Sequence, residues 1–122
     1  MKKGIIVLGH GSKAEEANKA FIQLSELFKQ RNAEDVVEPA FLQLSPPDLA
    51  TAVEKVVAQG VKKIIICPVF LFPGNHIQED IPAELAKERA KHPGVEFIMA
   101  DHMGVDERII AILADRVEEA CA

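Results

Sequence analysis

Four short apolar runs alternate along the chain with four segments in which apolar residues recur every three or four positions. The apolar runs, rich in β-branched residues, cover 4–8, 36–44, 62–69 and 95–100. The helical segments cover 13–30, about 46–60, 80–91 and 105–120. Strands that alternate with helices in this way predict a parallel sheet with crossover helices. We therefore expect an α/β fold, with a mainly parallel four-stranded sheet flanked by helices, four β-α units and one domain over residues 1–122.

Local signals place several of these boundaries. The first run is apolar at every position, which predicts a central buried strand. Ser12 is the expected N-cap of the first helix, and Asp80 that of the third, with Pro82 in its first turn. Pro46 and Pro47 are expected to end the second strand and to stand in the first turn of the next helix. In the first helix, four apolar residues should share one face: Ala17, Phe21, Leu24 and Phe28.

The last helix carries an unusually broad apolar stripe. Its residues are Ile109, Ile110, Ile112, Leu113 and Val117. This stripe is wider than a single contact with a sheet requires, so it implies a second packing partner. Because a four-stranded sheet of this size buries little surface and leaves its edge strands open, we expect a homodimer.

The composition and charge of the chain exclude several classes of function. Apolar residues make up 48% of the 122, charged residues 27%, and the net charge is −5. The absence of a basic stripe argues against nucleic-acid binding. The longest apolar stretch, 64–72, is too short to span a bilayer and contains a proline. The amino-terminal apolar segment ends too early for a signal peptide, and Cys67 and Cys121 have the character of a core and a terminal residue, so we expect a cytoplasmic protein with no membrane partner.

Candidate chemistry gathers where the strands end, since ligands of open α/β sheets bind outside the carboxyl ends of the strands. His10 lies between two glycines after the first strand, which exposes its ring. His76 follows Gly74 after the third strand, and His102 follows the fourth. Imidazole is both a ligand for divalent metals and a base near neutrality. Glu79 is a candidate third ligand, although an acid in the first turn of a helix is also ordinary dipole chemistry.

Two further features bear on this edge of the sheet. The loop after the third strand stays apolar at Phe70, Leu71 and Phe72, which together form a platform suited to a large flat ligand, or else part of the core. His92, at the end of the third helix, is expected to make only a favourable contact with the helix dipole.

Other motifs fail. Residue 14 is Ala where a dinucleotide loop needs its third glycine, no P-loop lysine follows, and no GxSxG elbow occurs.

The motifs resemble those of a known family. They are Gly9-His10-Gly11-Ser12, Phe41-Leu42-Gln43-Leu44-Ser45, and Pro68 to His76 followed by Asp80-Ile81-Pro82. Together they resemble the small CbiX-type sirohydrochlorin chelatases, which are similar to one half of the longer two-lobed chelatases. The resemblance covers the whole chain.

The resemblance implies a lyase that inserts a divalent metal into sirohydrochlorin without ATP, in cobalamin or siroheme-type biosynthesis. His10 would be the proton acceptor and a metal ligand, and His76 the second ligand. Cobalt is the expected ion, with iron and nickel as alternatives, and no cofactor is needed beyond this substrate ion. Substrate contacts would come from Ser12, Gln43, Leu71, Phe72, Pro73, Gly74, Asn75 and His76.

The chain departs from the family pattern at three positions. Gln43 and Pro46 stand where family members often have acids, and His102 stands where proline is usual. Lys13 and the helix N-termini would offset the negative net charge toward an acidic substrate. The rival hypothesis is a noncatalytic metal or tetrapyrrole carrier that uses the same histidines.

Overall fold

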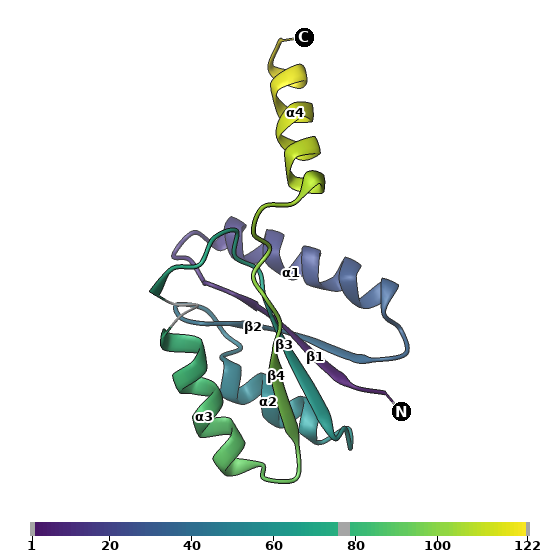
Figure 1. Ribbon diagram of the computed structural model, residues 1–122, viewed down its shortest axis with the longest axis vertical. Coiled ribbons are helices and arrows are strands. Elements are labelled where there is room, and N and C mark those ends of the chain that lie inside the picture. The colour runs from purple at the N-terminus through teal and green to yellow at the C-terminus, as the bar shows by residue number, and fades with distance from the viewer. Residues whose placement is uncertain (1, 76–78, 122) are drawn as a thin grey trace.

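The structure, a computed structural model, describes residues 2–75 and 79–121. Its elements are β1 (Gly4–Gly9), α1 (Glu15–Arg31), β2 (Val36–Phe41), α2 (Leu49–Val57), β3 (Lys63–Pro68), α3 (Ile81–Lys91), β4 (Glu96–Met99) and α4 (Glu107–Cys121). The predicted alternation of four strands with four helices is confirmed (Figure 1).

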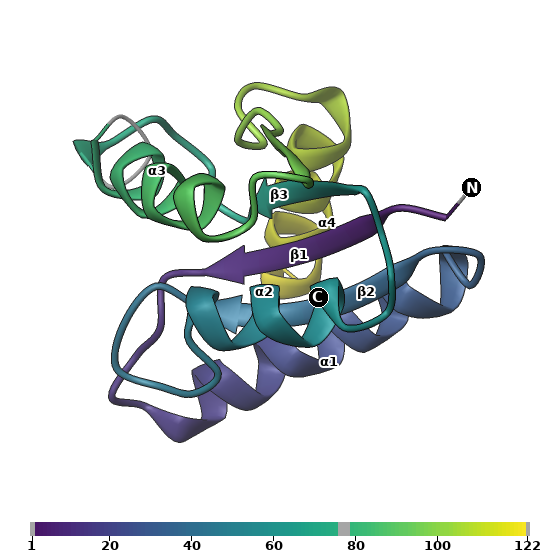
Figure 2. The same ribbon diagram turned by 90° about the horizontal axis from the view of Figure 1, so that it is seen from below.

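The four strands form one parallel sheet in the order β2-β1-β3-β4. Gly4 pairs with Val36 on one side and with Ile64 on the other, and β1 stays flanked by both strands as far as Leu8. Every residue of β1 is buried, which confirms that the first strand is central (Figure 2). The carboxyl ends of all four strands therefore point toward the same edge of the sheet.

Side chains alternate between the two faces of the sheet and build two apolar clusters. On one face, Ile6, Leu8 and Ile64 pack under α2 and α3. On the other face, Ile5 and Val7 pack with residues that include Phe21 of α1. Figure 1 shows α1 on one side of the sheet and α2 and α3 on the other.

The thiol of Cys67 belongs to the smaller cluster, beside the partly buried Phe21. Burial raises the pKa of this thiol. The side chain is half-buried, which agrees with a core role, and Cys121 is exposed at the end of α4.

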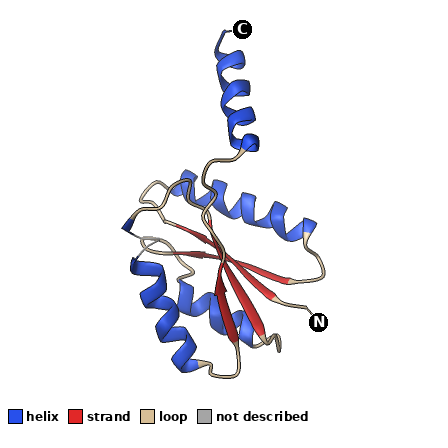
Figure 3. Cartoon of the chain, viewed as in Figure 1, coloured by secondary structure: helices blue, strands red, loops and turns tan. Residues whose placement is uncertain are grey.

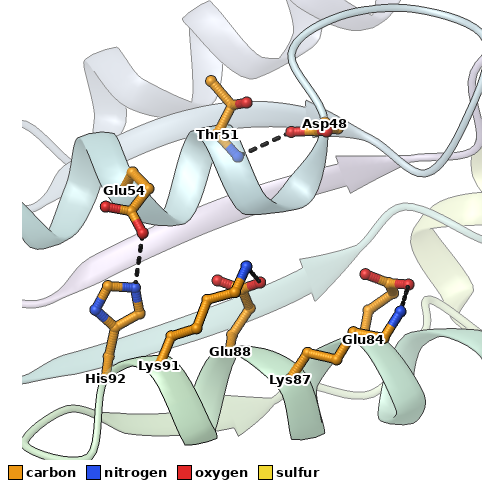
Figure 4. Close-up of polar contacts among 8 residues, drawn as sticks. All are labelled: Asp48, Thr51, Glu54, Glu84, Lys87, Glu88, Lys91 and His92. Carbon is orange, nitrogen blue, oxygen red and sulfur yellow. Dashed lines mark hydrogen bonds and ion pairs between the residues drawn. The ribbon is translucent and has the colours of Figure 1, made fainter.

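The passage from β2 to α2 differs from the expectation. β2 ends at Phe41, three residues early, and Leu44 takes a left-handed φ of 67°. Both prolines precede α2, so neither stands in its first turn. The N-cap is Asp48, whose carboxylate accepts a hydrogen bond of 2.8 Å from the Thr51 amide (Figure 4). A carboxylate cap satisfies an orphan N–H of the helix, which proline could not do.

Ser12 is not the N-cap of α1. That position belongs to Ala14, and the Oγ of Ser12 accepts a hydrogen bond of 3.0 Å from the Ala14 amide instead. The Asn18 side chain holds the Ser12 backbone from both sides, accepting from its N–H at 3.0 Å and donating to its carbonyl at 2.8 Å. The helix consequently begins at Glu15, two residues later than predicted.

Two helices leave apolar side chains uncovered. In α1 only Ser25 is buried, and Leu24 and Phe28 of the predicted face are 49% and 37% exposed. The described part of α4 contains no buried residue, and the helix stands away from the sheet (Figure 1). The expectation that α4 packs on its own sheet is therefore wrong. Four of the five stripe residues, Ile110, Ile112, Leu113 and Val117, are exposed, and Ile109 is partly buried.

Among the described residues, no helix is long and apolar enough to cross a membrane.

Candidate functional site

The loops at the carboxyl edge of the sheet are tied to one another by backbone hydrogen bonds. The amide of Leu42 donates to the Gly9 carbonyl at 2.8 Å, and the amide of Gln43 donates to the His10 carbonyl at 3.1 Å. On the other side, the amide of Val69 donates to the Leu8 carbonyl at 2.8 Å. The sheet ladder thus continues past the strands and holds the loops after β1, β2 and β3, which gather to the left in Figure 3.

The exposed imidazole of His10 follows directly on β1 and has neighbours on three sides. Its Nδ1 lies 3.1 Å from the Gly11 carbonyl oxygen, and its Nε2 lies 3.4 Å from the Gln43 side-chain nitrogen. Phe70 meets the ring edge-on, with 6.2 Å between ring centroids. Because a carbonyl oxygen only accepts, the Gly11 contact fits a proton on Nδ1, and the lone pair of Nε2 then faces the Gln43 amide as an acceptor. That lone pair is the one a proton or a metal ion would use.

Gly11 has a reason to be glycine. Its φ is +89°, and a Cβ at this position would overlap the backbone carbonyl of Gln43. The absence of a side chain lets the loop after β1 lie directly against the loop after β2. This close approach brings the side chain of Gln43 to His10, a contact that the sequence did not indicate.

The apolar platform is mostly exposed. Leu71 and Phe72 have 45% and 69% of their surface open to solvent, whereas Phe70 is half-buried against the main cluster. The described neighbours Pro73, Gly74 and Asn75 are exposed as well. His76 lies outside the described residues.

The loop after β4 runs beside this platform. The amide of Met103 donates to the Phe70 carbonyl and that of Gly104 to the Leu71 carbonyl, both at 2.8 Å. His102, which is half-buried, is thereby held next to the platform, as expected from its position after the fourth strand. Gly104 adopts a φ of +66° beside it.

The other candidate ligands are not gathered into a preformed cluster. Glu79 is exposed just before α3. Among the described residues, no group of three His, Cys, Asp or Glu side chains could hold a metal ion. His92 ends α3, as expected, and also contacts Glu54 of α2 at 3.0 Å, which the sequence did not indicate (Figure 4).

A cavity of about 510 Å³ opens beside the His10 loop, between the start of α1 and the loop after β2. Ser12, Lys13 and Lys19 line it from one side, and Ser45 and Pro46 from the other. Sequence reasoning singled out Ser12 and Lys13 but missed Lys19 and Asn18. The one sequence feature that could have indicated Asn18 and Lys19 is that they follow Ser12 by about two helical turns.

Comparison with known proteins gives consistent results. The family model described as CbiX matches residues 4–120. The chain is 33% identical to a sirohydrochlorin cobaltochelatase of Methanococcus aeolicus, and the match covers 95% of this chain and 98% of that protein. It is 31% identical to the chloroplastic sirohydrochlorin ferrochelatase of Arabidopsis thaliana, covering 94% of this chain but 51% of that protein.

A solved structure also matches this chain over about half of its own length. The sirohydrochlorin chelatase SirB of Bacillus subtilis subspecies spizizenii, in complex with cobalt, superposes with a TM-score of 0.94 at 29% identity. The match covers 98% of this chain and 51% of SirB. The chain therefore spans nearly the whole of a short relative and about half of the long ones.

Proposed function

Because the chain belongs to the CbiX family, we propose that it inserts a divalent metal ion into sirohydrochlorin in tetrapyrrole biosynthesis. The observation that carries the proposal is the arrangement of His10, whose Nε2 lone pair lies at the carboxyl edge of the sheet beside an exposed apolar platform. Both the base and the platform are features that this reaction requires.

The chemistry follows from the substrate. Insertion of a divalent metal removes two pyrrole N–H protons and strips water from the ion. In the proposal, Nε2 of His10 first holds the incoming ion. Once the ion has passed to the macrocycle, the same lone pair accepts one of the two pyrrole protons, and the other proton leaves to water. His76 is proposed as a second ligand and Glu79 as a third, while Ser12, Gln43 and the loop over 71–75 contact the macrocycle.

Cobalt is the ion proposed first. The support is that the Methanococcus aeolicus relative, matched over nearly its full length, is a cobaltochelatase. Iron is the alternative, since the longer Arabidopsis thaliana relative is a ferrochelatase. Imidazole and carboxylate ligands accept both ions, so metal competition must decide between them.

We further propose that the working unit is a homodimer. The support begins with α4, whose apolar stripe has no cover within its own described chain. On the α1 side of the sheet, Ile98 is 38% exposed, and Ile65 and Cys67 beside it are only partly buried. In the proposed dimer, α4 of each protomer lies on this strip of its partner.

The comparison with SirB supports the same arrangement. The match includes 98% of this chain, and hence most of α4, on only half of SirB. In that longer protein a second half accompanies the first. A second copy of this chain would take the place of that half and enclose a cleft between the two carboxyl edges.

Anaerobic incubation of sirohydrochlorin with Co²⁺, followed by visible absorbance, tests the activity. We expect the protein to accelerate insertion, and His10→Ala to lower the rate by about 10²- to 10⁴-fold, as for loss of a general base. The matched control is His92→Ala, which removes an imidazole remote from the carboxyl edge and should leave the rate within about twofold of the parent. Metal binding without accelerated insertion would instead identify a carrier.

A further inference from the structure

The cavity beside the His10 loop has a charge that differs from the rest of the protein. The chain has a net charge of −5, but the titratable residues that line this cavity are Lys13, Lys19 and Glu15. Their sum is +1. The cavity is therefore a local region of positive charge in an acidic protein.

Among the described residues, neither Lys13 nor Lys19 forms an ion pair. Five other lysines make an ion pair with a carboxylate: Lys3, Lys55, Lys63, Lys87 and Lys91. An ammonium group that has no internal partner is available to an external anion.

The floor of the cavity is apolar. Phe41 is 2% exposed and lies beneath it, and Ile22, Leu44 and Pro46 complete the apolar part. A volume of about 510 Å³ is within the range of small-molecule sites, about 300–1,000 Å³. This space is larger than an inorganic anion needs, and its apolar floor offers such an ion nothing. A lining that combines apolar side chains with two lysines suits a ligand that has both an apolar body and carboxylate arms.

We propose that this cavity binds one carboxylate-bearing edge of the tetrapyrrole, with Lys13 and Lys19 as the residues that recognise the carboxylates. The inference rests on the proposed function for the identity of the ligand. Its location fits that function, because Ser12 in the cavity wall is two residues from His10. A macrocycle held over His10 would extend a substituted edge past Ser12 into the cavity.

The test measures binding of metal-free sirohydrochlorin directly, by its change in absorbance or fluorescence, together with KM and kcat for Co²⁺ insertion. For each of Lys13→Gln and Lys19→Gln, we expect Kd and KM for the tetrapyrrole to rise about 3- to 10-fold, the range for an exposed charge-assisted contact. The double variant should lose about 10- to 100-fold. Because the lysines do not touch the reacting nitrogens, kcat at saturation and the affinity for Co²⁺ alone should stay within about twofold.

Two further variants separate recognition from structure. Lys19→Arg keeps the charge and should retain binding within about threefold of the parent. Lys29→Gln removes a lysine of the same helix that does not line the cavity, and it should change nothing. If the two cavity variants match Lys29→Gln, the proposal is wrong, even where insertion proceeds normally.

Failure of the proposed function has a different signature. If the parent protein binds sirohydrochlorin in a lysine-dependent way but does not accelerate insertion, the cavity stands as a tetrapyrrole site and the chelatase activity falls. If the parent protein binds no sirohydrochlorin at all, the cavity assignment is overturned as well.

Discussion

The most informative substitution is Leu113→Ala in α4. Leu113 exposes 61% of its surface, and full burial of a leucine is worth about 1.5–3 kcal/mol. Covering the exposed part in a dimer should therefore contribute about 1–2 kcal/mol, most of which alanine would lose. A symmetric dimer contains the position twice, so we expect a loss of about 2–3 kcal/mol, equivalent to a rise in the dimer Kd of about 30- to 150-fold.

Sedimentation equilibrium over a concentration series measures this shift directly, since one chain has a mass of 13.4 kDa. The parent protein should sediment as two chains at concentrations where Leu113→Ala is largely single. Glu118→Ala is the control, because helical spacing places residue 118 away from the apolar stripe. A parent protein that sediments at 13.4 kDa throughout, or a Leu113→Ala variant with the same Kd as Glu118→Ala, would refute the reasoning.

Three other substitutions test the fold around the site. Gly11→Ala should cost about 1–3 kcal/mol in urea unfolding and impair insertion, since a Cβ there overlaps Gln43, whereas Gly94→Ala, which has open space around it, should not impair insertion. Asp48→Ala should cost about 1 kcal/mol at pH 7 through loss of the N-cap. The Thr51 hydrogen bonds lower the pKa of Asp48 below its ordinary value of 3.8. The contribution of the cap is therefore full above about pH 4 and is lost as the pH falls through the lower pKa of the folded state. The unfolding free energies of parent and variant should thus converge in acid, and an unchanged gap at pH 2 would contradict this. Glu88→Met should raise the free energy of unfolding by about 1 kcal/mol, seen as a higher urea midpoint. The reason is that the buried Oε1 of Glu88 has no hydrogen-bond partner among the described residues. A lower midpoint would show that the contact of Glu88 with Lys91 contributes more than the burial of its carboxylate costs.

Periodicity was sufficient to predict the strands of the sheet, because each strand places apolar residues in the core: the whole of β1, and residues such as Val37, Ile64 and Phe97 in the other three. Periodicity could not predict the position of α4. An apolar stripe indicates that a helix packs against another surface, but not whether that surface belongs to the same chain. The predicted N-cap of α1, Ser12, was wrong because of a contact that is distant along the chain. Ser12 has the right side chain, but Asn18, a full turn inside the helix, holds its backbone outside the helix.

The candidate site, too, could be predicted only in part from the sequence. The motif placed His10 correctly at the sheet edge, since a strand end fixes where the next residue lies. The orientation of its ring depends on Gly11, Gln43 and Phe70, which come from three different loops. Only the order β2-β1-β3 brings those loops together, and strand order cannot be read from the spacing of residues along the chain.

The shape of the proposed substrate is a further argument for the proposed dimer. A tetrapyrrole macrocycle is flat and has two faces, whereas one sheet has a single carboxyl edge, so one protomer can cover one face only. A longer chain can supply the second wall from its other half. In the proposed dimer a second copy supplies that wall, and α4, which has no buried residue in the described chain, joins the two copies. Weakening the dimer should therefore lower insertion activity even though Leu113 is remote from His10 in sequence, and Leu113→Ala should regain activity as protein concentration rises. His10→Ala should not regain it at any concentration, which separates loss of assembly from loss of chemistry.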